Sequence, residues 1–282
     1  VAILSVSDAY SSRYGSATFP SETMAQAVKL IEAVEETGLV YTYAENYCYM
    51  DHSFEMRRRY EEGAIGEVTY AEGNYIHDCE SIWLDLTYGE TDHWRNRLPP
   101  TFYCTHSLGP IMTITGHRPV RVVGFENPPI EAFYRLGHPG GHPSGIEMVT
   151  LDNGAIVKSI HGPLKLEPSR ITYQVFGTKG FLGGSAEDMN VHLYQEGDEP
   201  CKGETTVYKP EKFVSPELAK NIGLTTHGGS DFYPTHFFIE KILGRPDGKW
   251  AIDVYQAVDM GICGILAFRS ILNGNKPFKV PN

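Results

Sequence analysis

The sequence has 282 residues, of which 41% are hydrophobic and 12% aromatic, so it can build a packed core and is neither a disordered nor a fibrous chain. Its 35 acidic and 24 basic residues give a formal net charge of -11, without a basic cluster that carries interleaved aromatics, which excludes nucleic acid as a partner. No apolar stretch approaches the roughly 20 residues that cross a bilayer, so we expect a soluble, cytoplasmic protein with no membrane partner. The five cysteines make no CxxC pair, which fits reduced thiols in the cytoplasm.

The first elements predict a strand, a helix and a second strand. Residues 1–6 (VAILSV) form an apolar run, and a helix signal at Pro20-Ser21 precedes an apolar stripe that ends at Gly38. Residues 39–44 (LVYTYA) then form the second strand. Two strands joined by a helix within about 45 residues indicate a parallel pair.

The rest of the chain predicts an open, mostly antiparallel sheet with helices on one face. Asn153-Gly154 marks a tight hairpin, because Asn-Gly adopts the positive φ angles that a two-residue turn requires. The fold class is therefore α+β, with a truncated α/β remnant before the sheet. The expected strands are 67–77, 120–125, 146–151, 155–160 and 170–176, and the expected helices are 53–62, 106–115, 231–243 and 250–272.

A dinucleotide-binding turn is missing from this pattern. No GxGxxG follows a strand anywhere in the sequence. The nearest pattern, Gly177 to Gly183 (GTKGFLG), has the wrong spacing and lies between strands, so we interpret it as a turn.

The stretch TFYCTHSLGP (101–110) carries the first candidate for chemistry. His106 falls in the first turn of a predicted helix, where the partial positive charge of the helix end disfavours imidazolium. A neutral histidine there accepts a proton, as a general base on a sugar hydroxyl must. Tyr103, three residues before it, is a candidate acid, base or orienting donor. A capped helix with a buried histidine, beside a tyrosine bonded to water, is the alternative.

Other polar residues stand where side chains enter a cleft. His77 and Asp78 follow a long strand, although Asp78 also suits the cap of a turn. Arg95 has a guanidinium fork suited to a carboxylate or to paired sugar oxygens, but a surface position explains it as well.

His227, Gly228, Gly229 and Asp231 precede a helix, and the two glycines permit a ligand to approach the backbone closely. A plain helix start is the alternative for this segment. A zinc or manganese site built from His77, Asp78, His106 and His227 is chemically possible, but nothing in the spacing requires it, so we expect no metal.

Several stretches in a fixed order resemble the Gfo/Idh/MocA oxidoreductase family, near its NAD-dependent glycosidases. They are AENYCYM (44–50), EEGAIGEVTYAEGNYIHD (61–78), HWRNRLPPTFYCTHSLGPIMTITG (93–116), HGGSDF (227–232) and AIDVYQAVDMGICGILAFRSILNG (251–274). The resemblance implies that residues 1–44 are a remnant of a nucleotide-binding α/β domain and that residues 45–282 are a substrate-binding and oligomerisation domain. It also implies NAD as cofactor, although the phosphate-binding loop is absent, and a homo-oligomer formed through the open sheet.

The resemblance extends to the substrate pocket. Residues matching Tyr49, His77, Arg95, Tyr103 and His106 line that pocket in sugar-acting members, and the match is residue by residue. We therefore expect His106 and Tyr103 to be catalytic. The expected sugar-binding residues are Tyr49, His77, Asp78, Arg95, His227 and Asp231.

The leading hypothesis is a carbohydrate-active enzyme that acts on a sugar or glycoside, by hydride transfer with NAD or by redox-assisted elimination of a glycosidic bond. One alternative is an NAD-independent lyase or hydrolase that uses the same pocket, with or without a metal. The other is a non-catalytic subunit that binds a sugar or supports assembly.

Overall fold

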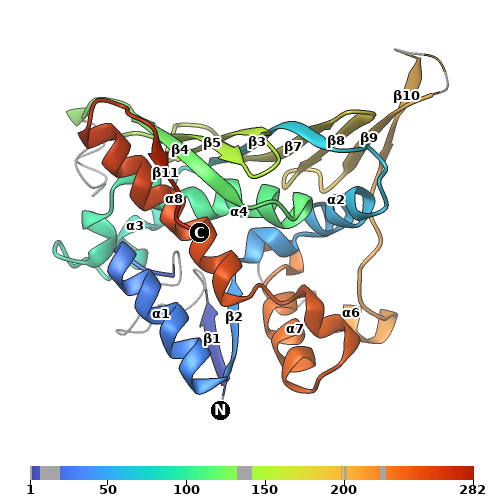
Figure 1. Ribbon diagram of the computed structural model, residues 1–282, viewed down its shortest axis with the longest axis horizontal. Coiled ribbons are helices and arrows are strands. Elements are labelled where there is room, and N and C mark those ends of the chain that lie inside the picture. The colour runs from blue at the N-terminus through green and yellow to red at the C-terminus, as the bar shows by residue number, and fades with distance from the viewer. Residues whose placement is uncertain (1, 7–19, 132–141, 198, 200–201, 223–226) are drawn as a thin grey trace.

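The computed structural model describes residues 2–6, 20–131, 142–197, 199, 202–222 and 227–282. Its main element within these residues is a nine-stranded sheet (Figure 1). The strands are β3 (Val68–Ile76), β4 (Pro119–Glu126), β5 (Gly145–Leu151), β6 (Ile156–Gly162), β7 (Arg170–Gly177), β8 (Gly180–Ser185), β9 (Val191–Glu196), β10 (Gly203–Tyr208) and β11 (Phe278–Lys279). Their order is β10-β9-β8-β7-β3-β6-β5-β4-β11, and only the β3–β6 pair is parallel.

The structure confirms the open, mostly antiparallel sheet that we expected. Its strands were recognisable because buried and less buried side chains alternate along them. In β5 the residues at 145, 147, 149 and 151 are buried, while those between them are half-buried. The sequence pattern missed β8, β9, β10 and β11. Three of the six residues of β8 (GFLGGS) are glycines, and β10 (GETTVY) is exposed along almost its whole length, so neither shows the expected alternation.

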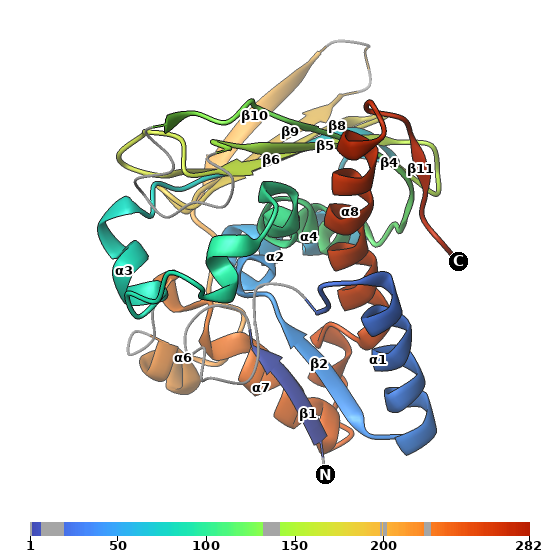
Figure 2. The ribbon, with the colours of Figure 1, turned by 90° about the vertical axis from the view of Figure 1, so that its left-hand side faces the viewer.

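Helices cover one face of this sheet, as Figures 1 and 2 show for α2 (Asp51–Glu61), α4 (Cys104–Thr115) and α8 (Val254–Leu272). Every residue of α4 is buried, polar ones included, so this helix is enclosed on all sides and lies at the centre of the molecule. The other helices are α1 (Met24–Thr37), α3 (Trp83–Leu86), α6 (Pro216–Ile222) and α7 (Phe232–Ile242).

Contact between α4 and the sheet is unusually close at one glycine. An ideal Cβ built on Gly73 in β3 would lie 1.8 Å from the carbonyl oxygen of Ser107. Since real Cβ atoms do not approach an oxygen so closely, only glycine lets α4 rest on β3 at this level. This contact sets the height of the first turn of α4 above the sheet.

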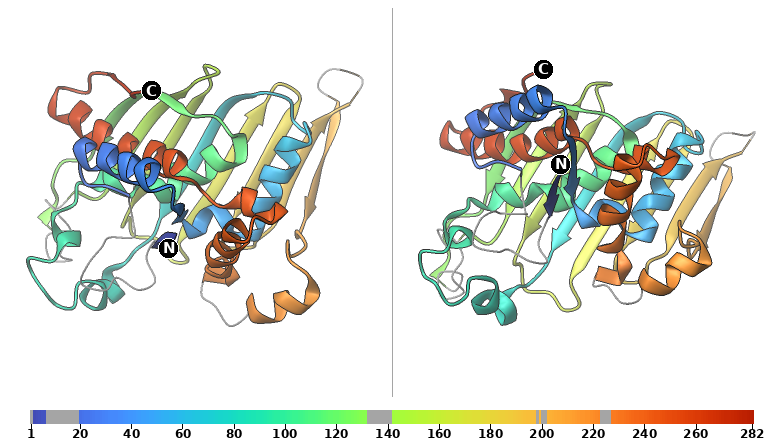
Figure 3. Two further views of the ribbon diagram at one scale, coloured as in Figure 1. Left: turned by 60° about the horizontal axis from the view of Figure 1, so that its bottom comes forward. Right: turned by 90° about the horizontal axis from the view of Figure 1, so that it is seen from below.

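A small second sheet precedes the large one. Strand β1 (Ala2–Val6) pairs in parallel with β2 (Val40–Ala44), which confirms the predicted pair; Val1 lies outside the described residues. Helix α1 joins the two and runs beside α8 (Figure 3). The segment just before α8 is also hydrogen-bonded to β2. The Ile252 carbonyl accepts hydrogen bonds from the Tyr43 N–H and the Thr42 hydroxyl, each at 3.0 Å.

Helix α8 has the length and composition of a membrane-crossing helix, with 19 residues and a mean hydropathy of 1.2. However, 67% of its apolar stretch is buried inside the molecule, where it packs on β4 and α4. Its apolar character is therefore that of a core helix. Asp253 and Gln256 cap its N-terminus with a reciprocal pair of hydrogen bonds.

His52 in α2 is a buried histidine whose two ring nitrogens make no hydrogen bond with any residue that the structure describes. Its ring stacks on Tyr173 at 5.9 Å. Burial, only partly opposed by the charge of Asp188, lowers the pKa of His52 from 6.5 to about 4. The unfolded chain thus binds a proton below pH 6.5 that the folded chain takes up only near pH 4.

We therefore expect acid to destabilise the fold through His52. Its contribution to stability is intact above pH 6.5 and falls as the pH drops toward 4, by about 3 kcal/mol over that window. Urea unfolding of His52→Leu between pH 4 and 7 should show a flatter pH dependence than the parent. The partly exposed His192→Gln should keep the parental slope, and an unchanged slope in His52→Leu would contradict the assignment.

Replacing Gly73 by alanine should destabilise the fold by about 2 kcal/mol, since the added methyl must push the first turn of α4 away from β3. Gly109→Ala is the matched control, because the nearest atom to its new methyl is the flexible Met260 Sδ at 3.2 Å. Urea unfolding of both variants measures the difference. Equal stability of the two variants would show that α4 is not held by this contact.

Candidate active site

A buried hydrogen bond joins the end of β2 to the start of α4. Glu45 follows β2 directly, and its Oε1 lies 2.7 Å from Nδ1 of His106, the third residue of α4. Both side chains have no exposed surface. An ionised carboxylate only accepts hydrogen bonds, so we assign the imidazole hydrogen to Nδ1, which leaves Nε2 to accept a proton.

The expected place of His106 in the first turn of a helix is confirmed. The backbone dipoles at the start of the helix produce a positive potential, which favours a neutral imidazole. Glu45 adds an opposing negative charge, and its Oε2 makes no hydrogen bond with any described residue. The carboxylate therefore orients the ring and stabilises an imidazolium once His106 has taken up a proton.

Three tyrosines surround the His106 ring. The ring centroids of Tyr47 and Tyr75 lie 4.8 Å from it, and that of Tyr103 lies 6.0 Å away. Tyr47 lies in the short 3₁₀ helix after Glu45, Tyr75 lies in β3, and Tyr103 directly precedes α4. These rings form an aromatic wall that is largely buried and that combines flat apolar faces with hydroxyls able to form hydrogen bonds.

Arg95 is almost fully buried and donates from Nη1 to the hydroxyl oxygen of Tyr103. The guanidinium therefore bonds Tyr103, and its burial contradicts the surface position considered from the sequence, while the contact with a sugar stays a prediction. Because Arg95 occupies the phenol oxygen as a donor, the hydrogen of Tyr103 is donated in another direction. A positive group at this oxygen stabilises negative charge that develops there.

His77 and Asp78, which directly follow β3, have different roles. The His77 ring lies 5.7 Å from Tyr75, and its Nδ1 is 2.8 Å from Sγ of Cys79. Asp78 accepts from the Glu80 N–H at 3.1 Å and pairs with Lys165 at 3.1 Å. Asp78 thus caps a turn, the alternative considered from sequence, while His77 extends the aromatic wall.

His227 and Asp231 reach the same wall from the other side. His227 has a left-handed φ of 52°, its ring lies 6.0 Å from Tyr47, and its Nδ1 lies 2.9 Å from Asp231 Oδ2. The other oxygen of Asp231 accepts from Asn46 Nδ2 at 3.0 Å. Gly229 is required by packing, since a Cβ there would lie 2.0 Å from Ile222 Cγ2. The segment is therefore joined by side-chain bonds to the residue that follows Glu45.

Tyr49 takes a position in the core. Its hydroxyl donates to the Trp250 carbonyl at 3.0 Å and accepts from the Ile252 N–H at 3.2 Å, while its ring packs on Phe237. Burial raises the pKa of Tyr49. Tyr47, two residues earlier, is the tyrosine of this stretch that contacts the His106 ring.

The structure thus brings His77, Arg95, Tyr103, His106, His227 and Asp231 around one wall, and it adds Glu45, Asn46, Tyr47 and Tyr75, which sequence reasoning did not assign. The available signal was Glu45 itself, an acidic residue directly after a buried strand. Among the described residues, no three histidine, cysteine or acidic side chains converge on a point where they could hold a metal ion.

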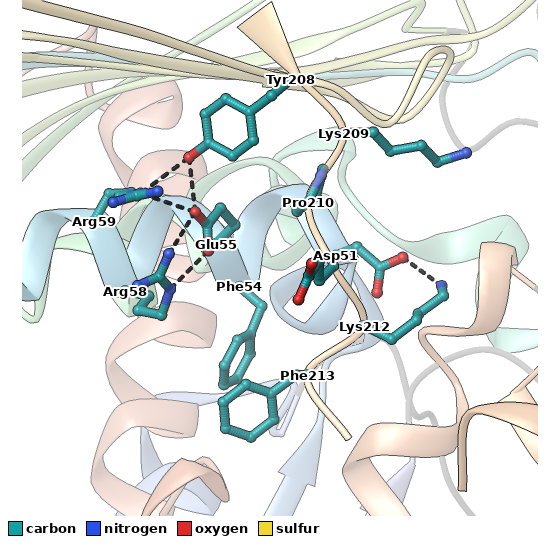
Figure 4. A pocket seen from close by; sticks show the side chains of 11 residues that line it. Asp51, Phe54, Glu55, Arg58, Arg59, Tyr208, Lys209, Pro210, Lys212 and Phe213 are labelled. Atoms are coloured by element: carbon teal, nitrogen blue, oxygen red, sulfur yellow. Dashed lines mark hydrogen bonds and ion pairs between the residues drawn. The ribbon is translucent and has the colours of Figure 1, made fainter. Parts of the chain in front are cut away.

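A separate hollow of about 590 Å³ opens between α2 and the segment after β10 (Figure 4). Glu55 accepts hydrogen bonds there from Arg58, Arg59 and Tyr208. Burial alone would raise the pKa of Glu55, but these donors lower it below its ordinary value. Lys212 pairs with Asp51 on the opposite side of the hollow. The charged groups of this lining are therefore largely bonded to one another.

The chain is similar in sequence to known glycosidases. Residues 145–282 match the family model described as glycosyl hydrolase 109, C-terminal domain. A glycosyl hydrolase family 109 protein of Solibacter usitatus is 27% identical over 93% of the chain and 64% of its own length. An alpha-N-acetylgalactosaminidase of Bacteroides fragilis is 24% identical over 92% of the chain and 67% of its own length. The chain thus spans about two thirds of the length of these relatives.

The fold also matches solved dehydrogenases. An inositol dehydrogenase homologue of Azotobacter vinelandii, solved with NADH and myo-inositol, superposes with a TM-score of 0.66 at 15% identity, over 92% of this chain and 69% of its own. At this identity the match concerns the fold alone, whereas the family model and the sequence relatives concern the glycosidases. Residues 145–282 therefore match the C-terminal domain of glycosyl hydrolase family 109, and the chain is a distant homologue of these glycosidases with a Gfo/Idh/MocA-like fold.

Proposed function

We propose that this chain is the sugar-binding and proton-transferring part of a carbohydrate-active enzyme that acts on glycosides. The observation that carries the proposal is the buried hydrogen bond between Glu45 and His106. It fixes the imidazole with its acceptor nitrogen opposite the carboxylate, beside an aromatic wall that suits a pyranose ring. The named activity of the Bacteroides fragilis relative makes an α-linked N-acetylgalactosaminide the first substrate class to test.

In this proposal His106 Nε2 removes a proton from the sugar, and Glu45 stabilises the imidazolium that results. Tyr103, with its oxygen held by Arg95, acts as the acid or as a donor that orients the substrate. Hydride transfer at a sugar carbon and redox-assisted elimination of the glycosidic bond both require a proton to leave the sugar. The same residues therefore serve either reaction.

NAD is the cofactor of the proposed redox reaction, because the solved neighbour was crystallised with NADH. Its nicotinamide would accept and return the hydride. The residues of this chain do not fit the pyrophosphate of such a cofactor, since the segment after β1, residues 7–19, contains the single glycine Gly15. We therefore assign to this chain only the sugar-side groups.

Association of copies through the open sheet forms part of the proposal. Large apolar side chains, including Phe125, Ile156, Phe176 and Val207, remain exposed on strands β4, β6, β7 and β10. Exposed apolar side chains that gather on one surface are typical of protein interfaces. A second copy of this chain is the partner we propose for them.

We expect the protein, supplied with about 10 mM NAD to offset the weak cofactor binding of this chain, to release nitrophenol from p-nitrophenyl α-N-acetylgalactosaminide. His106→Gln and Glu45→Gln should each lower kcat about 100-fold, because the first removes the base and the second its charged partner. His117→Gln, on a histidine that pairs with Asp152 on the surface, is the control and should keep parental rates. Parental kcat in His106→Gln would refute the assignment of the base.

Isothermal titration of these 282 residues with NAD should give a Kd weaker than about 1 mM, since the chain has no glycine-rich turn for the pyrophosphate. Titration of N-acetylgalactosamine into the same sample measures sugar binding independently. A micromolar Kd for NAD would show that another segment binds the phosphates and would overturn the restriction to sugar-side groups.

A further inference from the structure

A second buried carboxylate lies beneath α4. Glu147 in β5 has no exposed surface, and its two oxygens bond to neighbours on β6. Oε2 accepts from the Ser159 hydroxyl at 2.8 Å, and Oε1 lies 2.9 Å from Nε2 of His161. The Ser159 oxygen in turn lies 2.8 Å from the hydroxyl of Ser107 in α4. The carboxylate thus begins a chain of hydrogen bonds that crosses from the sheet to the helix.

The charge of Glu147 sets the direction of this chain. An ionised carboxylate cannot donate, so the single hydrogen of Ser159 is given to Glu147. Ser159 must then accept the hydrogen of Ser107. Without this acceptor, Ser107 would turn to the Cys104 carbonyl within its own helix, which lies at the longer distance of 3.3 Å.

Ser107 directly follows His106, and the backbone of these two residues is held by other strands as well. Tyr173 of β7 donates from its hydroxyl to the His106 carbonyl at 2.7 Å. Gly73 of β3 lets the Ser107 carbonyl come close to the sheet. The turn that carries His106 is therefore attached to the sheet at three points, and the chain from Glu147 is the one that ends in a charge.

A purely packing role does not explain a glutamate at this position. Glu147 alternates with Val149 and Leu151 on the same buried face of β5, where an apolar side chain would avoid the desolvation of a carboxylate. Buried carboxylates are retained where they fix one arrangement among several. Here the arrangement is the rotamer of Ser107, and through it the position of the helical turn that contains His106.

We propose that Glu147 is a positioning residue for His106 and acts through Ser159 and Ser107. This inference rests on the proposed function of His106 as a base. Glu147 touches neither His106 nor the aromatic wall in the contacts described above, so its effect passes through the backbone of α4. The consequence is a more restricted orientation of the imidazole toward Glu45.

The test uses NMR of the protein labelled with ¹³C in its histidine rings, in which loss of one signal in His106→Gln assigns His106. Ser159→Ala breaks the link to α4 but leaves Glu147 bonded to His161. Glu147→Gln keeps the shape and removes the charge. We expect both variants to shift or broaden the His106 signal and to change its titration midpoint. On an active substrate they should lower kcat about tenfold with little change in KM, as a slightly misplaced base would.

Thr115→Val is the matched control, because it removes a buried hydroxyl, bonded to the Ile111 carbonyl at 2.9 Å, from the opposite end of α4. Thermal unfolding confirms that each variant is folded. A parental His106 signal in both variants overturns the proposal, as does an equal change in Thr115→Val, which would indicate general loosening of α4. Because the NMR signal requires no turnover, absence of glycosidase activity would refute the proposed function without obscuring this result.

Discussion

The arrangement of the site depends on the hydrogen bond that joins Glu45 to His106 across the interior of the molecule. The bond links the end of a strand in the small sheet to the first turn of the central helix, so it fixes two layers of the fold against each other. The hydrogen bond between these two ionisable groups, neither of which has exposed surface, offsets part of the cost of burying them. The aromatic wall then assembles around a ring whose orientation is already determined.

The contacts around this bond separate the charged groups of the site from its aromatic rings. Charged groups are bonded to members of the wall, as Arg95 is to Tyr103 and Asp231 to His227. The rings of Tyr47, Tyr75 and His106 form the wall itself. Fixed hydrogen bonds keep the charged groups oriented, which would reduce the reorganisation that the proposed proton transfer requires.

Sequence patterns were sufficient for the features that depend on neighbours along the chain. The helical spacing after His106, the parallel pair of β1 and β2 and the alternation of β5 were all predictable in this way. The partner of His106 was not, because Glu45 lies 61 residues away and no local rule connects them. The contact of Tyr47 with the His106 ring was not predicted either, because residues two apart in a 3₁₀ turn, such as Tyr47 and Tyr49, point in different directions.

The bonds that residues 250–252 make to β2 and Tyr49 have a consequence for synthesis of the chain. Glu45 and His106 leave the ribosome early, yet the backbone of Trp250 and Ile252 holds the segment that carries Glu45. A nascent chain released before residue 252 would lack these bonds and would leave the Tyr49 hydroxyl without its two partners. Assembly of the site is therefore complete only after residue 252 has been synthesised, and products truncated before it should lack a formed centre.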